Sequence, residues 1–261
     1  MIRNEGNLGF ADGVNVGLRA ARHLLVLPLN PDMRVVGDAL SRLVGDASAH
    51  PEAGGVGPRV LKEDGTLQAS RCRFPSLLNQ LLAAMYVYQL LPGSRFFNRE
   101  RLGGGDATTP APVAAVSGCC FLMRRSVLET MGVLDEDFFM YAEGADLCYR
   151  AWQTGFEVHD APVGEIAHLR GASSRLASRR NSLEYRRSIL RFFRKHRGLL
   201  ATQGARVLLQ LFLVVRLPYW AIRARFAPDR KTGSAQFSLC RAGIRFLLQP
   251  LDRILDRAVR P

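Results

Sequence analysis

Short apolar runs that end in turn residues constrain the fold of this chain more than any other feature. Residues 23–29 (HLLVLPL), 54–61 (GGVGPRVL) and 113–123 (VAAVSGCCFLM) each have the length and composition of a buried strand. Segments in which apolar residues recur at helical spacing separate these runs. Because strands that alternate with helices usually build one sheet with helices on its faces, the sequence predicts an α/β fold with a mostly parallel sheet.

Helices are expected to begin and end at identifiable residues. Gly132 and Gly155 each follow a predicted helix, where a glycine commonly ends a helix because it adopts a left-handed conformation without strain. The pattern predicts helices over 35–46, 125–131 and 145–154, and further extended segments over 156–162 and 165–168.

The charge of the chain is unevenly distributed. Residues 1–173 carry 16 Lys and Arg against 19 Asp and Glu, a net charge of −3, whereas residues 174–261 carry 20 against 4, a net charge of +16. A nearly neutral body followed by a strongly basic tail is typical of a protein whose tail contacts an anionic surface. The chain is therefore expected to contain a domain over 1–175 and a basic amphipathic helical tail over 176–261.

The apolar segment 207–222 (VLLQLFLVVRLPYWAI) indicates how the tail meets that surface. It is 16 residues long, contains Arg216 and is interrupted by Pro218. A helix that spans a bilayer needs about 20 apolar residues. The segment thus favours a helix in the membrane interface, with Tyr219 and Trp220 at the level of the lipid headgroups. A true membrane span is the alternative.

Cysteine spacing and the composition of the tail bear on location and partners. The five cysteines form no CxxC pair and have no zinc-finger spacing with histidine, and the first residues lack the apolar core of a signal peptide. The apolar residues of the tail cluster as Leu, Val and Phe helices instead of exposed stacking aromatics, which argues against a nucleic-acid partner. The sequence predicts a cytoplasmic protein held peripherally on the inner face of the cell membrane by anionic lipids.

Asn30, Pro31 and Asp32 directly follow the first predicted strand. Ligands of open α/β sheets bind at the carboxyl ends of the strands. One carboxylate there can hold Mg²⁺ or Mn²⁺ against phosphate oxygens, because these cations prefer oxygen ligands. A plain turn after a strand is the alternative that the spacing leaves open.

Four blocks of sequence together resemble a known family. In chain order they are NEGNLGFADGVNVGLRAA, LLVLPLNPDMRV, VSGCCFLMRRSVLETMGVLDEDFFMYAEGADLCYRAWQTGF and IAHLRGASS. The resemblance covers about residues 3–197 and is to the family 2 glycosyltransferases, most closely to the bacterial rhamnosyltransferase-like branch that builds cell-surface polysaccharides. One such block is a weak signal, whereas four in register are specific.

The resemblance implies a GT-A fold and an inverting transfer of a sugar from a nucleotide-sugar donor to a hydroxyl of a glycan or lipid-linked acceptor. It also implies Mg²⁺ or Mn²⁺ on the donor diphosphate. Asp32 becomes a metal ligand and Asn30 a donor contact, and His168 falls where a second metal or diphosphate ligand is expected. Asn15 becomes a candidate donor contact, with a helix N-cap as the alternative.

The stretch Glu143-Gly144-Ala145-Asp146-Leu147 departs from the family pattern, which is Glu-Asp-x-Asp-Leu. Inversion in one displacement needs a carboxylate that takes the proton of the attacking hydroxyl, and the resemblance assigns this role to the position of Gly144. Three interpretations stay open. Glu143 or Asp146 acts as the base, or the protein binds its substrates but turns over poorly or not at all, or the Gly replaces a natural Asp. For Asp146, a role as an acid near a helix N-terminus competes with catalysis.

The resemblance also begins late in the family pattern. Family members normally carry a preceding segment with a first strand, a helix and a second strand whose Asp recognises the nucleotide base. The chain is therefore expected to be N-terminally incomplete, as a fragment or through a start placed too late, and to bind a nucleotide-sugar weakly. A catalytically impaired or sugar-binding partner of a polysaccharide-assembly complex is the alternative function.

Overall fold

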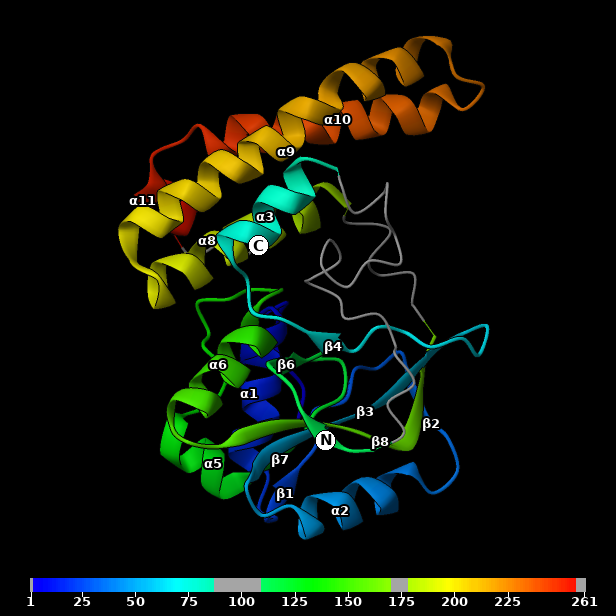
Figure 1. Cartoon of the computed structure of the whole chain (residues 1–261), viewed down its shortest axis with the longest axis vertical. Coiled ribbons are helices and arrows are strands. Elements are labelled where there is room, and N and C mark those ends of the chain that lie inside the picture. Colours follow the sequence, from blue (N-terminus) through cyan, green and yellow to red (C-terminus); the bar gives the residue numbers. More distant parts are fainter. Residues whose placement is uncertain (1, 87–108, 170–177, 257–261) are drawn as a thin grey trace. The chain divides into compact units, whose positions relative to one another are not determined.

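The computed structural model describes residues 2–86, 109–169 and 178–256, and contacts divide the chain into two compact units (Figure 1). Helix α3 (Leu77–Ala84), which the sequence-based division places in the first domain, belongs to the second unit. The expected boundary at residue 175 lies outside the described residues. The sheet unit comprises Met1–Phe74, Asn98–Ala172 and Arg260–Pro261, and the helical unit comprises Pro75–Phe97 and Ser173–Val259.

A six-stranded sheet in the order β1-β7-β3-β8-β2, with β5 beside β8, forms the centre of the sheet unit. The pairing of β3 with β8 is parallel and the longest, and the other pairings in this sheet are antiparallel. The α/β class is confirmed, and the sheet is mixed. Its strands are β1 (Leu25–Val26), β2 (Met33–Val35), β3 (Ala53–Lys62), β5 (Ala111–Pro112), β7 (Leu122–Arg124) and β8 (Glu157–His168); β4 (Arg71–Cys72) and β6 (Ala115–Val116) pair with each other.

The structure confirms one of the predicted strands and changes the bounds of the others. The run 54–61 is confirmed as the centre of β3. The run 23–29 holds only the two residues of β1, which pair antiparallel with β7, because Pro28 has no N–H to offer a ladder. The run 113–123 is divided between β6 and β7 by a turn at Gly118, and the two segments over 156–168 join into one strand, β8.

Four helices of the described chain belong to the sheet unit: α1 (Phe10–Ala20), α2 (Ala39–Ala49), α5 (Arg125–Met131) and α6 (Glu143–Gln153). The prediction for α5 is confirmed residue for residue, and the predictions for α2 and α6 are confirmed with shifted ends. Gly132 and Gly155 have φ angles of 82° and 86°, which only glycine adopts without strain. These two glycines end α5 and α6 as expected.

Two apolar cores lie on opposite faces of the sheet. Neighbouring residues of β7 show the alternation, because Leu122 packs into the core beneath α2 whereas Met123 packs into the core shared with α1 and α6. In the first core, Leu43 of α2 packs with Val56 of β3. In the second, Leu147 of α6 packs with Val158 of β8. The alternating strand pattern thus determines which residues face which helix layer.

The helical unit is an all-α assembly over its described residues. Its helices pack around buried Leu190, Phe193, Leu213 and Leu247. Helix α9 is continuous through Pro218, so the expectation of a 16-residue segment broken at this proline is wrong: packing against α3, α8 and α10 holds the helix together across the missing N–H. The remaining elements are α8 (Ser178–His196), α9 (Gly198–Phe226), α10 (Arg230–Leu247) and α11 (Leu251–Leu255).

The glycines of β3 yield a stability test. A Cβ atom on Gly55 would lie 2.4 Å from Cζ of Phe121, whereas one on Gly45, in the middle of α2, would meet no atom within 4 Å. We expect Gly55→Ala to lower the free energy of unfolding by about 1–3 kcal/mol, because the buried ring must move. Gly45→Ala is the matched control and should raise it by up to about 1 kcal/mol through helix propensity. Urea denaturation measures both, and a Gly55→Ala variant as stable as the parent would contradict the packing of this strand.

Candidate active site

Asp32 and His168 lie side by side although they are far apart in the sequence. Antiparallel pairing of β2 with β8 places Met33 opposite His168, and the N–H of Leu169 donates to the backbone oxygen of Asp32 at 2.8 Å. The Nε2 atom of His168 lies 3.2 Å from Oδ2 of Asp32. The structure therefore brings together the two residues that were expected to share a metal ion.

The hydrogen bonds of His168 show that this pair fits a cation. Its Nδ1 atom lies 3.1 Å from Oε1 of Gln68, and its Nε2 atom faces the Asp32 carboxylate. A neutral imidazole has one N–H and can donate to only one of these oxygens. In the tautomer whose Nδ1–H donates to Gln68, the lone pair of Nε2 faces the Asp32 carboxylate, and both residues can then bind one cation. Adjacent ligands of an octahedral ion at about 2.1 Å are about 3 Å apart, which the observed separation matches.

Asn30 and Pro31 form the turn between β1 and β2 and border an open groove. The N–H of Asn30 donates to the oxygen of Cys119 at 2.9 Å, and its own oxygen accepts from the N–H of Met33 at 3.1 Å. The groove has a volume of about 600 Å³ and a largely apolar lining. It runs between α1 and β1, and its lining includes Gly13, Gly17, Leu25, Pro28, Asn30 and Pro31.

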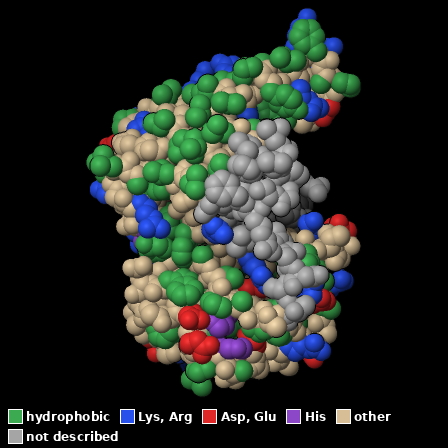
Figure 2. Space-filling view, viewed as in Figure 1, with side chains coloured by type: hydrophobic (Ala, Val, Ile, Leu, Met, Phe, Trp, Pro, Cys, Tyr) green, Lys and Arg blue, Asp and Glu red, His purple; other side chains and the backbone are tan. Residues whose placement is uncertain are grey.

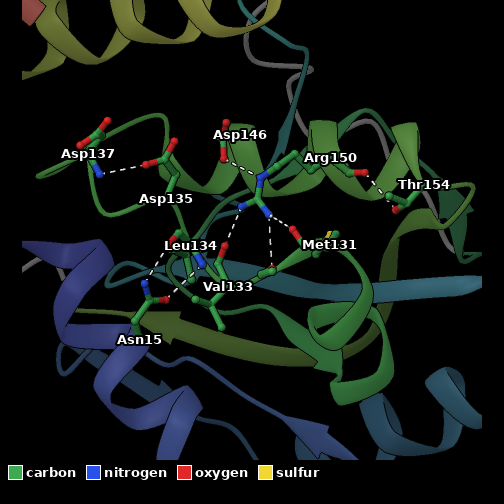
Figure 3. A network of polar contacts seen from close by, with 10 residues as sticks. Asn15, Met131, Val133, Leu134, Asp135, Asp137, Asp146, Arg150 and Thr154 are labelled. Atoms are coloured by element: carbon green, nitrogen blue, oxygen red, sulfur yellow. Dashed lines mark hydrogen bonds and ion pairs between the residues drawn. The ribbon is translucent and has the colours of Figure 1, made fainter.

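Asn15 is committed to a structural role. Its side chain is fully buried within α1, so it is no N-cap. The Nδ2 group donates to the oxygen of Leu134 at 2.8 Å, and Oδ1 accepts from the N–H of Leu134 (Figure 3). The Nδ2 group also donates to Oε1 of Glu136 at 3.0 Å. Both amide protons are used to hold α1 against the loop before α6. We therefore leave Asn15 out of the donor site.

Asp146 is also held by an internal network. Its carboxylate is fully buried and accepts from Nε of Arg150 at 2.9 Å. The same guanidinium donates to the backbone oxygens of Met131 at 2.7 Å and Val133 at 2.8 Å, so it ties α6 to the end of α5 (Figure 3). The ion pair with Arg150 commits this carboxylate to holding α6 in place. The geometry therefore favours Glu143 over Asp146 as the candidate base.

Glu143 has the properties that Asp146 lacks. It begins α6 and is 8% exposed, and within the described chain its Oε2 atom is buried without a hydrogen-bond partner. Burial, and next the charge of Asp146, raise the pKa of Glu143 to about 7. The two preceding residues, Tyr141 and Ala142, have φ angles of 70° and 59°. Non-glycine residues in this region cost of order 1–3 kcal/mol each and cluster at functional sites.

Gly144 lies against the turn at Gly118. A Cβ atom on Gly144 would lie 3.4 Å from Cα and 3.5 Å from N of Gly118, which is ordinary van der Waals contact. A Cβ atom on Gly118 would lie 3.9 Å from Oε1 of Glu143. The backbone therefore leaves room for a Cβ atom at position 144, next to Glu143.

The aromatic pair before α6 is buried. Phe138 and Phe139 are 0% and 8% exposed, so they belong to the interior. Gln68, which the sequence reasoning did not single out, is the partner of His168. The turn before Gln68 is the only feature of the sequence that indicates its position. This turn reverses the chain, so that the N–H of Gln68 donates to the oxygen of Val60.

The raised pKa of Glu143 predicts how stability depends on pH. Folding disfavours the charged carboxylate, so its penalty is absent below about pH 4.5, grows as the pH rises and is complete above about pH 7. As the pH rises from 5 to 8, we expect the free energy of unfolding of Glu143→Gln to increase relative to that of the parent by an amount on the order of 3 kcal/mol. Glu129→Gln, an exposed glutamate of α5, is the control. Urea denaturation measures the difference in the free energy of unfolding between Glu143→Gln and the parent. The same difference at pH 5 and pH 8 would show that the pKa of Glu143 is not raised.

Comparison with known proteins gives the chain its family. The model described as "Glycosyl transferase family 2" matches residues 1–132. The chain is 31% identical over 187 residues to N-acetylglucosaminyl-diphospho-decaprenol L-rhamnosyltransferase of Mycobacterium tuberculosis (strain CDC 1551 / Oshkosh). This alignment covers 67% of the chain and 60% of that protein. It is 27% identical over 173 residues to low-salt glycan biosynthesis hexosyltransferase Agl10 of Haloferax volcanii, over 64% of this chain and 50% of that protein.

Among solved structures, the chain is similar to GalNAc-T7 with UDP, GalNAc and Mn²⁺. The TM-score is 0.53 at 13% identity, over 98% of this chain and 46% of that chain. This likeness supports the GT-A fold that the sequence implied. The chain spans half to three fifths of the length of the two curated relatives. The extent of the family match and the identity to the rhamnosyltransferase show that the chain belongs to glycosyl transferase family 2.

Proposed function

We propose that the chain transfers a sugar, with inversion, from a nucleotide-sugar donor to a hydroxyl of a glycan or lipid-linked acceptor in cell-surface polysaccharide synthesis. The observation that carries this proposal is the contact between Asp32 and His168 at the end of β8. The relatives support the acceptor class, since one is named for a decaprenol-linked substrate and another for glycan biosynthesis.

Asp32 and His168 are the residues that would hold a divalent cation on the donor side. Bound there, Mg²⁺ or Mn²⁺ supplies positive charge to the diphosphate as it leaves. A carboxylate with an imidazole suits Mn²⁺ better than Mg²⁺, which prefers oxygen ligands alone. Gln68 fixes the ring of His168 through Nδ1 and leaves Nε2 for the ion. The groove beside Asn30 offers room for the rest of the donor.

Glu143 is the residue that would take the proton of the acceptor hydroxyl. A general base works best when its pKa is close to the pH at which the enzyme operates, and the pKa of Glu143 is about 7. Burial keeps water away from its carboxylate, and no cation among the described residues pairs with it. Asp146 is paired with Arg150 and holds α6 in place.

Gly144 supports the alternative function, a catalytically impaired protein that retains substrate binding. The family pattern has an aspartate at this position, and glycine cannot accept a proton. The space beside Gly118 is compatible with an aspartate there. Both functions use the same fold and the same donor site, so a substitution at position 144 separates them.

Helix α9 supports a peripheral membrane location. It is long and apolar enough to cross a membrane by length and composition. Its exposed large apolar side chains recur every three or four residues and so form one stripe, which we call the α9 stripe. Figure 2 shows hydrophobic side chains along α9 and α10. The α9 stripe consists of Val207, Leu211, Val214, Val215, Tyr219, Ile222 and Phe226.

The opposite face of α9 carries polar contacts that a lipid-surrounded helix would lose. Arg206 donates to the oxygen of Leu247 at 2.7 Å, and Arg216 donates to the oxygen of Ala83 at 2.9 Å. These bonds join α9 to α10 and α3 within the helical unit. Such one-sided packing favours a helix that lies in the membrane interface, with the +16 charge of residues 174–261 attracted to anionic lipid. The expected location is the inner face of the cell membrane.

Restoring an aspartate at position 144 tests the proposed function. With Glu143 as the base, Glu143→Gln should lower sugar transfer at least tenfold, because a positioned general base contributes about 10²–10⁴-fold, and Gly144→Asp should change it little. In the alternative function, in which the base is missing, Gly144→Asp should raise transfer at least tenfold. The assay measures nucleoside diphosphate released from a panel of nucleotide-sugars with Mn²⁺ and N-acetylglucosaminyl-diphospho-polyprenol as acceptor. Gly144→Ala is the steric control and should leave the rate unchanged. Activity in the parent that Glu143→Gln abolishes supports Glu143 as the base, whereas no transfer by any variant would contradict the proposed function.

Lipid binding tests the α9 stripe. We expect the triple variant Leu211→Gln, Val215→Gln and Ile222→Gln to lose flotation with vesicles that contain anionic phosphatidylglycerol, because it removes inserted apolar area. The matched control changes Leu40 and Val44, two exposed apolar residues of α2, to Gln. Flotation of the parent should survive high salt. Equal flotation of the triple variant and the control would refute the stripe as the membrane contact.

A further inference from the structure

A second group of metal-ligating side chains lies at the far end of β8 from His168. Glu52, Glu157 and His159 each offer one ligand atom, and these atoms all lie within 4.8 Å of one another. Glu157 begins β8 and His168 ends it. At about 3.3 Å per residue along a strand, the two groups are on the order of 30 Å apart. One ion cannot serve both.

The backbone holds this second group in place from two sides. Glu157 and His159 are two residues apart on β8, so their side chains point to the same face of the strand. The N–H of Glu157 donates to the backbone oxygen of Glu52 at 3.0 Å, directly before β3 begins. His159 lies between two strands, opposite Val56 on one side and Pro112 on the other. The ligand-bearing residues are thus positioned by the sheet itself.

The imidazole of His159 is buried and only partly satisfied. The residue is 4% exposed, and its Nε2 atom lies 2.7 Å from Oε2 of Glu157. Its Nδ1 atom is buried and has no hydrogen-bond partner in the part of the chain that the structure describes. The ring of His50 contacts it edge to face, with centroids 5.3 Å apart. The Nε2 atom faces the carboxylate of Glu157, so it is the nitrogen that can share an ion with that carboxylate.

The two carboxylates of the group have no Lys or Arg partner among the described residues. Among the described residues, neither Glu52 nor Glu157 forms an ion pair with Lys or Arg. The nearby guanidinium of Arg124 donates to backbone oxygens, including that of Ala53 at 2.9 Å, and not to these carboxylates. Figure 2 shows Asp or Glu and His side chains gathered at the surface of the sheet unit. Two adjacent carboxylates without a cation repel each other, and a divalent ion removes that repulsion.

We propose that Glu52, Glu157 and His159 bind a Zn²⁺ ion at this end of the sheet. One imidazole nitrogen and two carboxylate oxygens are a ligand set that Zn²⁺ accepts and that Mg²⁺, with its preference for oxygen alone, does not. Three protein ligands leave a fourth position for water. The bound ion joins the segment before β3 to the beginning of β8, so it stabilises the sheet at a point remote from Asp32.

Zn²⁺ binding to the full 261-residue chain tests this site. Isothermal titration in a reducing buffer compares the parent with Glu52→Gln, whose exposed side chain can change without disturbing the core. We expect Glu52→Gln and Glu157→Gln each to weaken one Zn²⁺-binding event at least tenfold. Glu165→Gln, a carboxylate on the same strand near its other end, is the matched control and should bind as the parent does.

A second readout separates this site from the Asp32–His168 pair. Added Zn²⁺ should still raise the melting temperature of an Asp32→Asn variant, in which the other proposed cation site is removed, and should raise that of an Asp32→Asn, Glu52→Gln double variant less. Mg²⁺ should not raise the melting temperature of Asp32→Asn. Unchanged Zn²⁺ affinity in both Glu52→Gln and Glu157→Gln, or loss of the thermal shift in Asp32→Asn alone, would overturn the proposal.

Discussion

The parallel pairing of β3 with β8 is the interaction on which the rest of the sheet unit depends. It runs from Ala53 opposite Glu157 to Lys62 opposite His168 and is the longest pairing in the sheet. Gly54, Gly55 and Gly57 let Phe156, Phe121 and Val116 approach the backbone of β3 closely. The far end of β8 then meets β2, and this places His168 beside Asp32. The contact between Asp32 and His168 is a consequence of strand register.

The two acids in the first turn of α6 have different surroundings and therefore different roles. Asp146 is paired with Arg150, whose guanidinium also holds the loop between α5 and α6. Glu143, three residues earlier, lacks such a partner among the described residues and has a pKa of about 7. Gly144 lies between them with room for a side chain. Position and burial therefore separate a structural carboxylate from a candidate base, which residue type alone could not do.

Local signals in the sequence predicted the elements they govern. Helix α5 with Gly132, helix α6 with Gly155 and strand β3 follow from spacing and glycine positions that lie within a few residues. The role of Asn15 could not be predicted in this way, because its partners Leu134 and Glu136 are more than a hundred residues away. Continuity of α9 across Pro218 likewise depends on packing against other helices. The family resemblance, in contrast, pointed to Asp32 and His168 together.

Metal-dependent binding of a nucleoside diphosphate is the most direct test of the central claim that Asp32 and His168 hold a cation against the donor diphosphate. Calorimetry would compare the parent chain in Mn²⁺ and in EDTA with the Asp32→Asn variant in Mn²⁺; Asp64→Asn, which changes an exposed turn residue, is the control. The account predicts binding in Mn²⁺ that weakens at least tenfold both in EDTA and in Asp32→Asn. Equal affinity under all these conditions would contradict it.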